Sequence, residues 1–413
     1  MKEKVRFGLI GFGARGSDLL RDVLLPMAKD EGVELCGVCD LYEDRAAAAA
    51  DKIEEATGVR PLCTTDYKEV IDKTDADAII IMCAWEYHIP IAIDAMKAGK
   101  YVGMEVGGAY SIDDCWRLVN TSEETGMPCM ILENCCYGNR ELMVLSMVKR
   151  GLFGEISACE GGYCHDLRHE VSYGEENRHY RLRNYTHRNC DNYPTHELGP
   201  ICKVLNINNG NRMLSLTSTA SCARGLHPYI VENRGADDKL ANVEFCQGDV
   251  IKTVIRCCNG ELITLTLDTT LPRAYSRRFT VRGTKASYWE DTDALFVDGK
   301  DNEKEWRPHE MWGTAAQYEK ENAHPLWQNY EAHGGHGGMD YLVFSAFLEA
   351  VRAGTQTPID VYDAASWMAI TALSEQSIAL GSVPQYIPDF TRGKWMNRTD
   401  MPDLRFRLDK LPE

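Results

Sequence analysis

The chain has 413 residues, with 62 acidic and 45 basic side chains and a formal net charge of −17 at pH 7. This acidic balance argues against a nucleic acid or an anionic membrane as partner, because both select a basic face. The length indicates two or three domains. A hydrophobic content of 44% with 26% charged residues is typical of a globular protein.

The start of the chain carries no apolar stretch with a small-residue cleavage site, and no run approaches ~18 uninterrupted apolar residues. We therefore expect a cytoplasmic protein without a membrane span. The sixteen cysteines are scattered through strand-like and helix-like segments, so we expect reduced thiols that pack as small hydrophobes. A redox or metal role for Cys36 and Cys39 is the alternative, but no second pair stands at zinc spacing.

The N-terminal residues predict a strand, a glycine-rich turn, a helix and a second strand. The predicted strands are Val5–Ile10 and Val33–Cys39, and Ser17 is predicted to cap the helix between them. The turn has the sequence Gly11-Phe12-Gly13-Ala14-Arg15-Gly16. This spacing is informative because it lies between a strand and a helix and because an acidic residue, Asp40, ends the next strand.

Each residue of this pattern has a physical role in dinucleotide binding. Gly11 permits the tight turn, Gly13 lets the backbone approach a pyrophosphate, and Gly16 allows close packing of helix and strand. The helix N-terminus offers free N–H groups to the phosphates. Asp40 is suited to accept hydrogen bonds from the ribose hydroxyls and repels a 2′-phosphate, which favours NAD over NADP. A glycine-rich turn without a ligand is the alternative.

Three further strand patterns continue the alternation, at residues 78–84, 101–104 and 129–132, and Pro90 is predicted to open a helix. Ligands of such sheets bind outside the carboxyl ends of the strands. The residues expected at that edge are Trp85, Glu86, Tyr87, His88, Glu105, Val106, Glu133 and Asn134. The sequence thus predicts an α/β fold that begins with an NAD-binding Rossmann domain over residues 1–135.

Beyond residue 135 the pattern changes to strands joined by short turns such as Cys258-Asn259-Gly260-Glu261. The predicted strands are 156–163, 213–220, 242–246, 250–256, 262–267 and 278–283, and the predicted helices are 142–150, 339–353 and 364–380. This order predicts an α+β substrate-binding domain over residues 136–413, built on an open, mostly antiparallel sheet. Its C-terminal helices could pack back on the first domain. Because one face of the sheet is exposed, we expect a homo-oligomer.

Several motifs outside the glycine loop resemble one family. They are Glu105-Val106, Leu132-Glu133-Asn134, Glu160-Gly161-Gly162-Tyr163, His165-Asp166-Leu167-Arg168, Tyr193-Pro194-Thr195-His196, Leu271-Pro272-Arg273 with Tyr275, and Gly335-His336-Gly337-Gly338-Met339-Asp340. The two-domain order resembles the Gfo/Idh/MocA oxidoreductases. The motifs are similar to those of one branch, glycoside hydrolase family 109, from about residue 5 to the segment Pro388-Asp389-Phe390.

The resemblance implies an NAD-dependent, retaining α-N-acetylgalactosaminidase. In that route NAD takes a hydride from C3 of the sugar, a base removes the acidified C2 proton, and the aglycone leaves from C1. Water then adds, and NADH returns the hydride. The cofactor carries the difficult step, so the protein needs groups that move protons near neutral pH rather than a pair of carboxylates.

These motifs contain the candidate catalytic residues His196, Tyr163 and Tyr193. The unperturbed pKa of histidine, about 6.5, suits a base, and Tyr163 could act as the C2 base if a neighbouring cation such as Arg181 lowers its pKa. Candidate substrate-binding residues are Glu133, Arg181, Tyr275 and His165. Candidate cofactor-binding residues are Gly11, Gly13, Ala14, Arg15, Gly16, Asp40, Trp85, His88, Glu105, Val106 and Asn134.

Each candidate also has a structural alternative. These are a backbone-satisfied helix start for His196, a half-buried core position for Tyr163, a solvated loop for Arg181, packing beside Pro272 for Tyr275, an ion pair for Glu133, and an aromatic lid on the sheet edge for Trp85. Metal binding by His165 beside Asp166 lacks a third and fourth ligand, so we expect no metal. His333 and His336 are expected to position backbone.

Departures from the resemblance also bear on function. Many dehydrogenases of the superfamily carry a lysine after the glutamate that here is Glu105, whereas this chain has Val106, which argues against an NAD-dependent sugar or cyclitol dehydrogenase. Gly107, Tyr180 and Glu197 differ from the residues usual in the branch, so the preferred sugar is open. A non-catalytic module that senses a sugar or NAD is a third hypothesis.

Overall fold

The structure, a computed structural model, describes residues 3–398 and 403–412. These residues form two compact units. Unit 1 comprises the described residues of Met1–Tyr137, Asn329–Ala365 and Thr399–Leu408, and unit 2 those of Gly138–Gln328, Ser366–Arg398 and Asp409–Glu413. Within the described ranges, no helix is both long and apolar enough to cross a bilayer.

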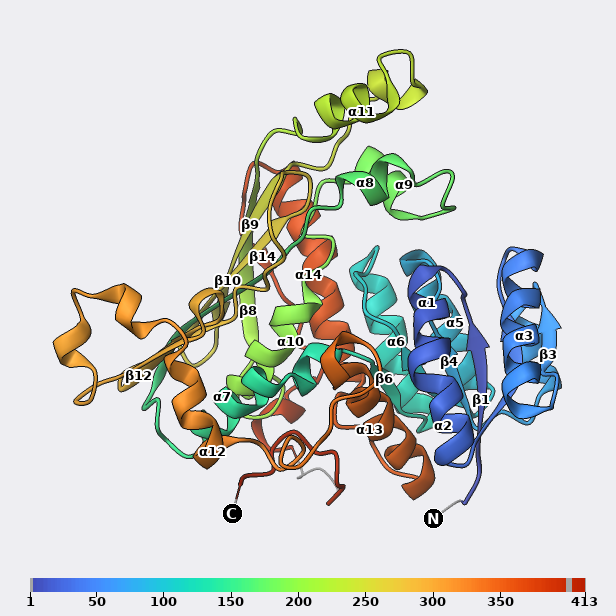
Figure 1. The fold of residues 1–413 in the computed structure, drawn as a ribbon, viewed down its shortest axis with the longest axis horizontal. Coiled ribbons are helices and arrows are strands. Elements are labelled where there is room, and N and C mark those ends of the chain that lie inside the picture. Colours follow the sequence, from blue (N-terminus) through green and yellow to red (C-terminus); the bar gives the residue numbers. More distant parts are fainter. Residues whose placement is uncertain (1–2, 399–402, 413) are drawn as a thin grey trace. The chain divides into compact units, whose positions relative to one another are not determined.

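Unit 1 contains a six-stranded sheet in the order β3-β2-β1-β4-β5-β6, in which every neighbouring pair is parallel (Figure 1). The strands are β1 Val5–Ile10, β2 Val33–Cys39, β3 Leu62–Thr64, β4 Ala78–Ile81, β5 Tyr101–Met104 and β6 Cys129–Ile131. All four residues of β4 are buried, as expected for a strand covered on both faces. The chain order reverses beside β1, so the loop after Ile10 lies at the point where such sheets bind ligands.

Helices alternate with these strands. In unit 1 they are α1 Ala14–Leu19, the π-helix η1 Leu20–Leu24, α2 Leu25–Asp30, α3 Glu43–Thr57, α4 Tyr67–Lys73, α5 Trp85–Lys97, α6 Ile112–Thr125, the 3-10 helices η2 Asn134–Tyr137 and η8 His336–Gly338, and α13 Met339–Ala353. Helix α14, Val361–Ala379, continues from unit 1 into unit 2. The predicted helix 339–353 is confirmed at both ends.

Two predicted helix starts are wrong. Gly13, not Ser17, is the N-cap of α1, and the Ser17 hydroxyl donates to the Phe12 carbonyl at 3.3 Å from inside the helix. Helix α5 begins at Trp85, five residues before Pro90. Proline lacks an N–H, but it is tolerated near a helix start because the first N–H groups have no intrahelical partner.

Unit 2 contains an eight-stranded sheet in the order β13-β12-β11-β7-β10-β9-β8-β14. The strands are β7 Ile156–Cys164, β8 Met213–Ala220, β9 Val250–Cys257, β10 Leu262–Asp268, β11 Thr280–Gly283, β12 Ala286–Trp289, β13 Ala294–Val297 and β14 Gln385–Tyr386. Only β7 and β10 pair in parallel among the described strands of this sheet. The prediction of a mostly antiparallel sheet is confirmed.

The predicted strand 242–246 is wrong. A 3-10 helix, η3 Lys239–Asn242, occupies its start, and no regular element covers the rest. The Asp238 carboxylate accepts from the Leu240 N–H at 2.8 Å and so begins the helical turn. An apolar–polar alternation over five residues therefore predicts the wrong element when a capping side chain precedes it.

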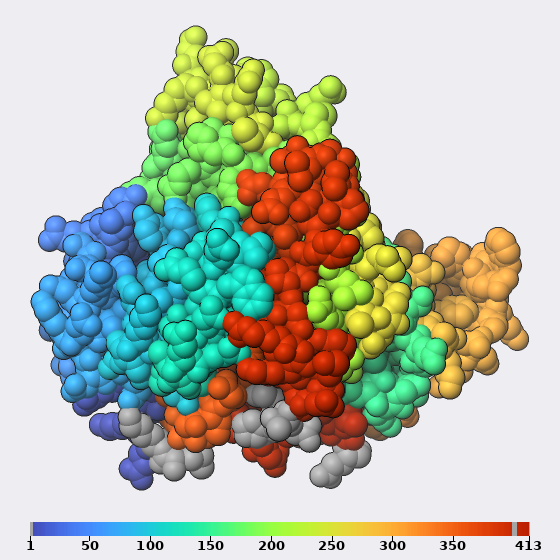
Figure 2. Space-filling view, turned by 180° about the vertical axis from the view of Figure 1, so that it is seen from behind, coloured from blue at the N-terminus to red at the C-terminus, as the bar shows by residue number. Residues whose placement is uncertain are grey.

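The helices of unit 2 lie along and beyond the sheet (Figure 1). They are α7 Asn139–Lys149, α8 Arg168–Ser172, α9 Arg181–His187, α10 Thr195–Val204, α11 Leu226–Arg234 and α12 Glu319–Asn322, with 3-10 turns η4 Glu290–Thr292, η5 Asn302–Lys304, η6 Pro308–Met311, η7 Thr314–Tyr318 and η9 Lys394–Met396. The segment after β13, in orange, projects from the rest of unit 2 in the space-filling view (Figure 2).

All sixteen cysteines lie within the described ranges as free thiols, and most are buried. Burial raises the pKa of Cys39 to about 12 and also raises the pKa of Cys36. A raised pKa disfavours the reactive thiolate, so the burial of these thiols argues against the redox alternative for the pair.

Candidate functional site

The loop after β1 has the backbone geometry that a dinucleotide requires. Gly11 has φ +100°, and a Cβ there would lie 2.5 Å from the backbone nitrogen of Cys83. A Cβ at Gly16 would lie 2.2 Å from the carbonyl oxygen of Gly11. At Gly13 an added Cβ would meet only the end of the Arg45 side chain, at 3.9 Å. Two glycines are therefore needed for packing, while the third leaves the backbone open to a ligand.

Asp40 is buried at the end of β2 and joins that strand to the loop. Its carboxylate accepts hydrogen bonds from the N–H groups of Phe12 at 2.6 Å and Tyr42 at 2.9 Å. A carboxylate can accept about four hydrogen bonds, so acceptor capacity remains for the hydroxyls of a ribose. The glycine loop and Asp40 together fit the adenosine diphosphate part of NAD.

Arg15 forms the centre of an ion-pair network in unit 1. Its guanidinium contacts Glu105 at 2.9 Å and Asp340 at 2.7 Å. Asp340 also accepts from Asn134 Nδ2 at 2.7 Å and from the His336 ring at 2.8 Å. Burial raises the pKa of Asp340, but the hydrogen bonds from Arg15 and His336 outweigh it and hold that pKa well below its usual range. The network ties the glycine loop to the ends of β5 and β6.

The predicted cofactor residues that follow β4, Trp85 and His88, are buried inside unit 1. Trp85 and His88 lie in the first turn of α5 rather than in a loop, and both are nearly inaccessible. His88 Nε2 donates to the Cys83 carbonyl at 2.9 Å, and burial lowers the His88 pKa to about 4, so the ring is neutral. A Cβ at Gly107 would lie 2.6 Å from the Trp85 indole, which explains the glycine after Val106.

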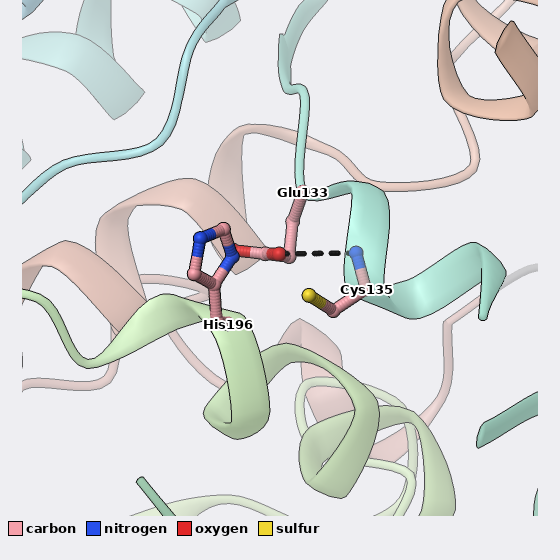
Figure 3. Close-up of side chains that lie close together, drawn as sticks. All are labelled: Glu133, Cys135 and His196. Atoms are coloured by element: carbon pink, nitrogen blue, oxygen red, sulfur yellow. Dashed lines mark hydrogen bonds between the residues drawn. The ribbon is translucent and has the colours of Figure 1, made fainter. Parts of the chain in front are cut away.

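Glu133 follows β6 and is fully buried. Its carboxylate accepts from the Cys135 N–H at 3.2 Å, and this bond closes the turn into η2 (Figure 3). The same view draws the His196 ring, which lies in the first turn of α10. Glu133 and Asn134 are therefore held by backbone and side-chain hydrogen bonds at the carboxyl edge of the parallel sheet.

The glycine loop supplies a first prediction. Gly11→Ala places a non-glycine residue at positive φ and also adds a methyl group that meets the backbone of Cys83. The steric contact should destabilise the protein by about 1–3 kcal/mol beyond the cost of the positive φ, and it should weaken NAD binding. The matched control is Gly58→Ala, because Gly58 also has positive φ (+75°) but has nothing within 4 Å of an added Cβ. Denaturant unfolding and calorimetric NAD titration measure both effects. Equal losses in the two variants would contradict the steric argument.

In unit 2, five side chains that the sequence singled out gather into one aromatic cluster: Tyr163, His165, Tyr193, His196 and Tyr275. The ring of Tyr163 lies 4.6 Å from that of Tyr193 and 5.6 Å from that of His196. Tyr193 and His196 are 4.8 Å apart. Tyr275, half exposed, packs edge-on against His165 at 5.3 Å and against Tyr163 at 6.1 Å.

Within the cluster, the Tyr163 hydroxyl and His165 Nδ1 are joined by a hydrogen bond of 2.9 Å. Burial and the positive charge of Arg181 lower the pKa of His165. A neutral imidazole has one nitrogen without a proton, so Nδ1 can accept the Tyr163 hydroxyl proton. Sequence reasoning assigned His165 to the substrate and missed this pairing.

Arg181 supplies the cation of the cluster. It lies at the start of α9 and is only 8% exposed, so the alternative of a solvated loop is wrong. Its guanidinium is 5.1 Å from the centre of the Tyr193 ring and 6.0 Å from that of Tyr163. Glu170, on α8, accepts a hydrogen bond from Arg181. No motif pointed to Glu170, because the pair joins two short helices across an irregular turn.

A second group of charged side chains includes the residue that follows His196 in the chain. That residue, Glu197, is buried, as is Glu141, and Glu290 is partly buried. The guanidinium of Arg277 contacts all three carboxylates, at 2.6 Å (Glu141), 3.3 Å (Glu197) and 3.2 Å (Glu290). These residues form the Arg277 ion cluster. It connects the segment that bears Tyr275 to the first turn of α10, and sequence reasoning did not foresee it.

Unit 1 thus carries a glycine-rich loop of the dinucleotide-binding type, and unit 2 carries a cluster of tyrosine and histidine side chains beside a buried arginine. Known families match two consecutive stretches of the chain. Residues 5–132 match the oxidoreductase family with an NAD-binding Rossmann fold, and residues 137–397 match the C-terminal domain of glycosyl hydrolase 109. The chain belongs to glycosyl hydrolase family 109, and is a glycosidase with an oxidoreductase-type fold.

Relatives agree with this assignment over nearly the full chain. An alpha-N-acetylgalactosaminidase from Tannerella forsythia is 38% identical over 95% of this chain and 88% of its own length. A protein of the same name from Shewanella oneidensis is 37% identical, over 95% and 86% respectively. A glycosyl hydrolase family 109 protein from Stenotrophomonas maltophilia is 38% identical over 96% and 91%.

Solved structures share the fold at much lower identity. A levoglucosan dehydrogenase in complex with NADH has a TM-score of 0.68 at 16% identity and covers 93% of this chain and 99% of its own. An inositol dehydrogenase homolog from Azotobacter vinelandii, complexed with NADH and myo-inositol, has a TM-score of 0.64 at 15% identity, over 94% and 98%. The Rossmann unit and mixed-sheet unit of the chain are thus the architecture of the Gfo/Idh/MocA oxidoreductases.

Proposed function

We propose that the protein is an NAD-dependent, retaining glycoside hydrolase that acts on α-N-acetylgalactosaminides. The observation that carries the proposal is the hydrogen-bonded pair of Tyr163 and His165 beside Arg181, an arrangement suited to moving a proton from carbon. The relatives named alpha-N-acetylgalactosaminidase support the choice of sugar. Membership of a glycosidase family together with an NAD-binding Rossmann unit supports the use of the nicotinamide cofactor.

The glycine loop and Asp40 would hold the cofactor, with Gly13 facing the pyrophosphate and Asp40 facing the ribose. When bound, NAD supplies reversible hydride transfer at C3 of the sugar. The neighbouring Arg15–Asp340 ion pair would keep the loop in its binding conformation, because it fixes the first turn of α1. Asn134, held by Asp340, is a candidate for a direct contact to the cofactor.

The aromatic cluster would carry out the proton transfers. Tyr163 Oη takes the C2 proton of the oxidised sugar while its own proton passes to His165 Nδ1. Loss of that proton expels the aglycone from C1, and water adds to the resulting double bond. The positive charge of Arg181 stabilises the phenolate character that develops on Tyr163.

His196 is the proposed base for the sugar hydroxyl that is oxidised, and Tyr193 and Tyr275 are proposed to contact the ring and its substituent. Aromatic faces and hydroxyl groups suit this role because a pyranose offers both C–H surfaces and hydroxyls. Tyr275 is half exposed, which leaves its ring accessible to a ligand.

A chromogenic glycoside panel tests the proposal. With NAD present, nitrophenyl α-N-acetylgalactosaminide should release nitrophenol without accumulation of NADH, and the sugar product formed in D₂O should carry deuterium at C2. A sugar dehydrogenase, the second candidate, would accumulate NADH and release no nitrophenol. Hydrolysis without deuterium at C2 would contradict the elimination route, because direct displacement leaves the C2–H bond intact.

A further inference from the structure

The partner of Arg181 has no assigned role. Glu170 belongs to the short helix α8 and is not part of the aromatic cluster. We propose that Glu170 is a positioning residue that holds Arg181 against the two tyrosines and sets the acidic limit of the enzyme's pH range. The inference rests on one part of the proposed function, the joint transfer of a proton by Tyr163 and His165.

Contacts on both sides of Glu170 support the positioning part. Its Oε1 accepts a hydrogen bond from Arg181 Nη1 and lies 3.6 Å from His179 Nε2. The Arg181 backbone N–H in turn donates to His179 Nδ1 at 3.2 Å. Both ends of Arg181, backbone and guanidinium, are therefore fixed by the same pair of residues. The Arg181 side chain is 9% exposed, whereas that of Glu170 is 35% exposed, so the carboxylate is the more accessible member of the pair.

The charge of Glu170 is present at neutral pH. Burial raises its pKa, but the attraction of Arg181 and His179 outweighs burial and lowers that pKa below the usual glutamate value. An ionised carboxylate next to a buried guanidinium reduces the positive potential that neighbouring groups experience. Glu170 thus determines how strongly Arg181 acts on the proton-transfer pair.

The charged groups around His165 act on its protonation in opposite directions. Burial, Arg181 and His196 oppose a positive charge on the ring, whereas Glu170 and Asp166 favour one. Asp166 is already paired with Arg168 at 2.7 Å. The other groups in contact with the ring are the side chains of Tyr163 and Tyr275. Replacing Asp166 would also leave Arg168 without this partner. Replacing Glu170 changes the protonation of His165 and leaves the Asp166–Arg168 pair intact.

Glu170→Gln separates charge from shape. The glutamine carbonyl can still accept from Arg181, but the negative charge is lost, so the pKa of His165 should fall. Protonated His165 cannot accept the Tyr163 proton, so the acidic limb of kcat/KM follows the His165 pKa. The limb should move to lower pH by about half a unit, and the ratio of variant to wild-type activity should rise as the pH falls. A purely structural defect lowers activity at every pH alike.

Two variants serve as controls. Glu170→Asp keeps the charge but shortens the side chain, so kcat should fall while the acidic limb stays in place. Glu176→Gln removes another glutamate of the same stretch that is ion-paired to an arginine, Arg234, at 2.6 Å. This pair lies outside the aromatic cluster, so the pH profile of Glu176→Gln should match that of the wild type.

A second measurement does not depend on activity. The His165 ring can be titrated by NMR in the full chain of wild type and Glu170→Gln, and its pKa should be lower in the variant. An unmoved acidic limb in a folded Glu170→Gln protein, or an unmoved His165 pKa, would overturn the inference. If the wild type showed no glycosidase activity with NAD, the proposed function would fail while the NMR titration still decided the role of Glu170.

Discussion

Replacement of Tyr163 by phenylalanine is expected to lower kcat/KM for α-N-acetylgalactosaminides by about 10²- to 10⁴-fold. The ring remains and can still pack against Tyr193, but the hydroxyl that is hydrogen-bonded to His165 Nδ1 is gone. Removal of the C2 proton then has no base at the correct position. Because the glycine loop is untouched, calorimetric titration should find the NAD affinity unchanged, and deuterium incorporation at C2 should fall in parallel with turnover.

The matched control is Tyr173→Phe. Tyr173 also lies in unit 2 with a histidine and an arginine at its ring, His169 at 4.6 Å and Arg234 at 4.5 Å. It is outside the aromatic cluster, so its replacement should leave turnover within about twofold of wild type. A Tyr163→Phe enzyme that retained wild-type C2 exchange would remove this hydroxyl from the mechanism and return the role of base to His196.

The second large effect concerns stability. Arg277→Met should lower the free energy of unfolding by about 3–5 kcal/mol, because it leaves the carboxylates of Glu141, Glu197 and Glu290 without their shared cation. Glu141 and Glu197 are almost fully buried, so water cannot replace the guanidinium. Thermal and denaturant unfolding measure the loss.

The loss should depend on pH in a defined direction. Burial already raises the pKa of Glu290, and Arg277 opposes that rise. Without Arg277 nothing opposes the raised pKa of Glu290, so the folded state of the variant binds more protons than its unfolded state. The difference between wild type and variant should therefore narrow as the pH falls from about 7 toward the unfolded glutamate pKa near 4.3.

Arg140→Met controls for the loss of an arginine with two acidic partners. Arg140 contacts Asp293 at 2.8 Å and Glu319 at 2.9 Å, but the side chains of these partners are 34% and 40% exposed. Solvent screens such pairs, and the expected cost is about 1 kcal/mol or less. Equal destabilisation of the two variants would show that burial of the Arg277 ion cluster does not determine its contribution.

Periodicity predicts the presence of the long strands in both units better than the residues at which elements begin and end. Buried parallel strands such as β4 are continuous apolar runs, and long antiparallel strands such as β9 alternate, so both leave a clear pattern. The predicted start of α5 is wrong because a proline is tolerated in the first turns of a helix. The predicted strand at residues 242–246 is wrong because the capping side chain of Asp238 begins a helical turn there. Short strands such as β12, with four residues, are below the length at which alternation is informative.

Motifs predicted the members of the aromatic cluster, and the structure of unit 2 brings those members together. The sequence predicts Arg181 as the cation beside Tyr163, but the carboxylate that pairs with this arginine could not be predicted from one sequence. Arg181 and Glu170 are 11 residues apart on different helices, and Arg15 and Asp340 are 325 residues apart. Ion pairs between distant segments leave no periodic trace, because any acidic residue of the chain is an equally good partner until the fold selects one.

The link from Arg15 to Asp340 has a consequence for biosynthesis. Unit 1 is discontinuous in the chain. Phe347 of α13 packs against Phe7 of β1 at 5.9 Å between ring centroids, and the same helix supplies Asp340. A nascent chain that ends after β6 therefore lacks the Phe347 contact of its first strand and one of the two carboxylates, Asp340, that pair with Arg15. We therefore expect the glycine loop to reach its final conformation only after α13 has been synthesised, late in translation.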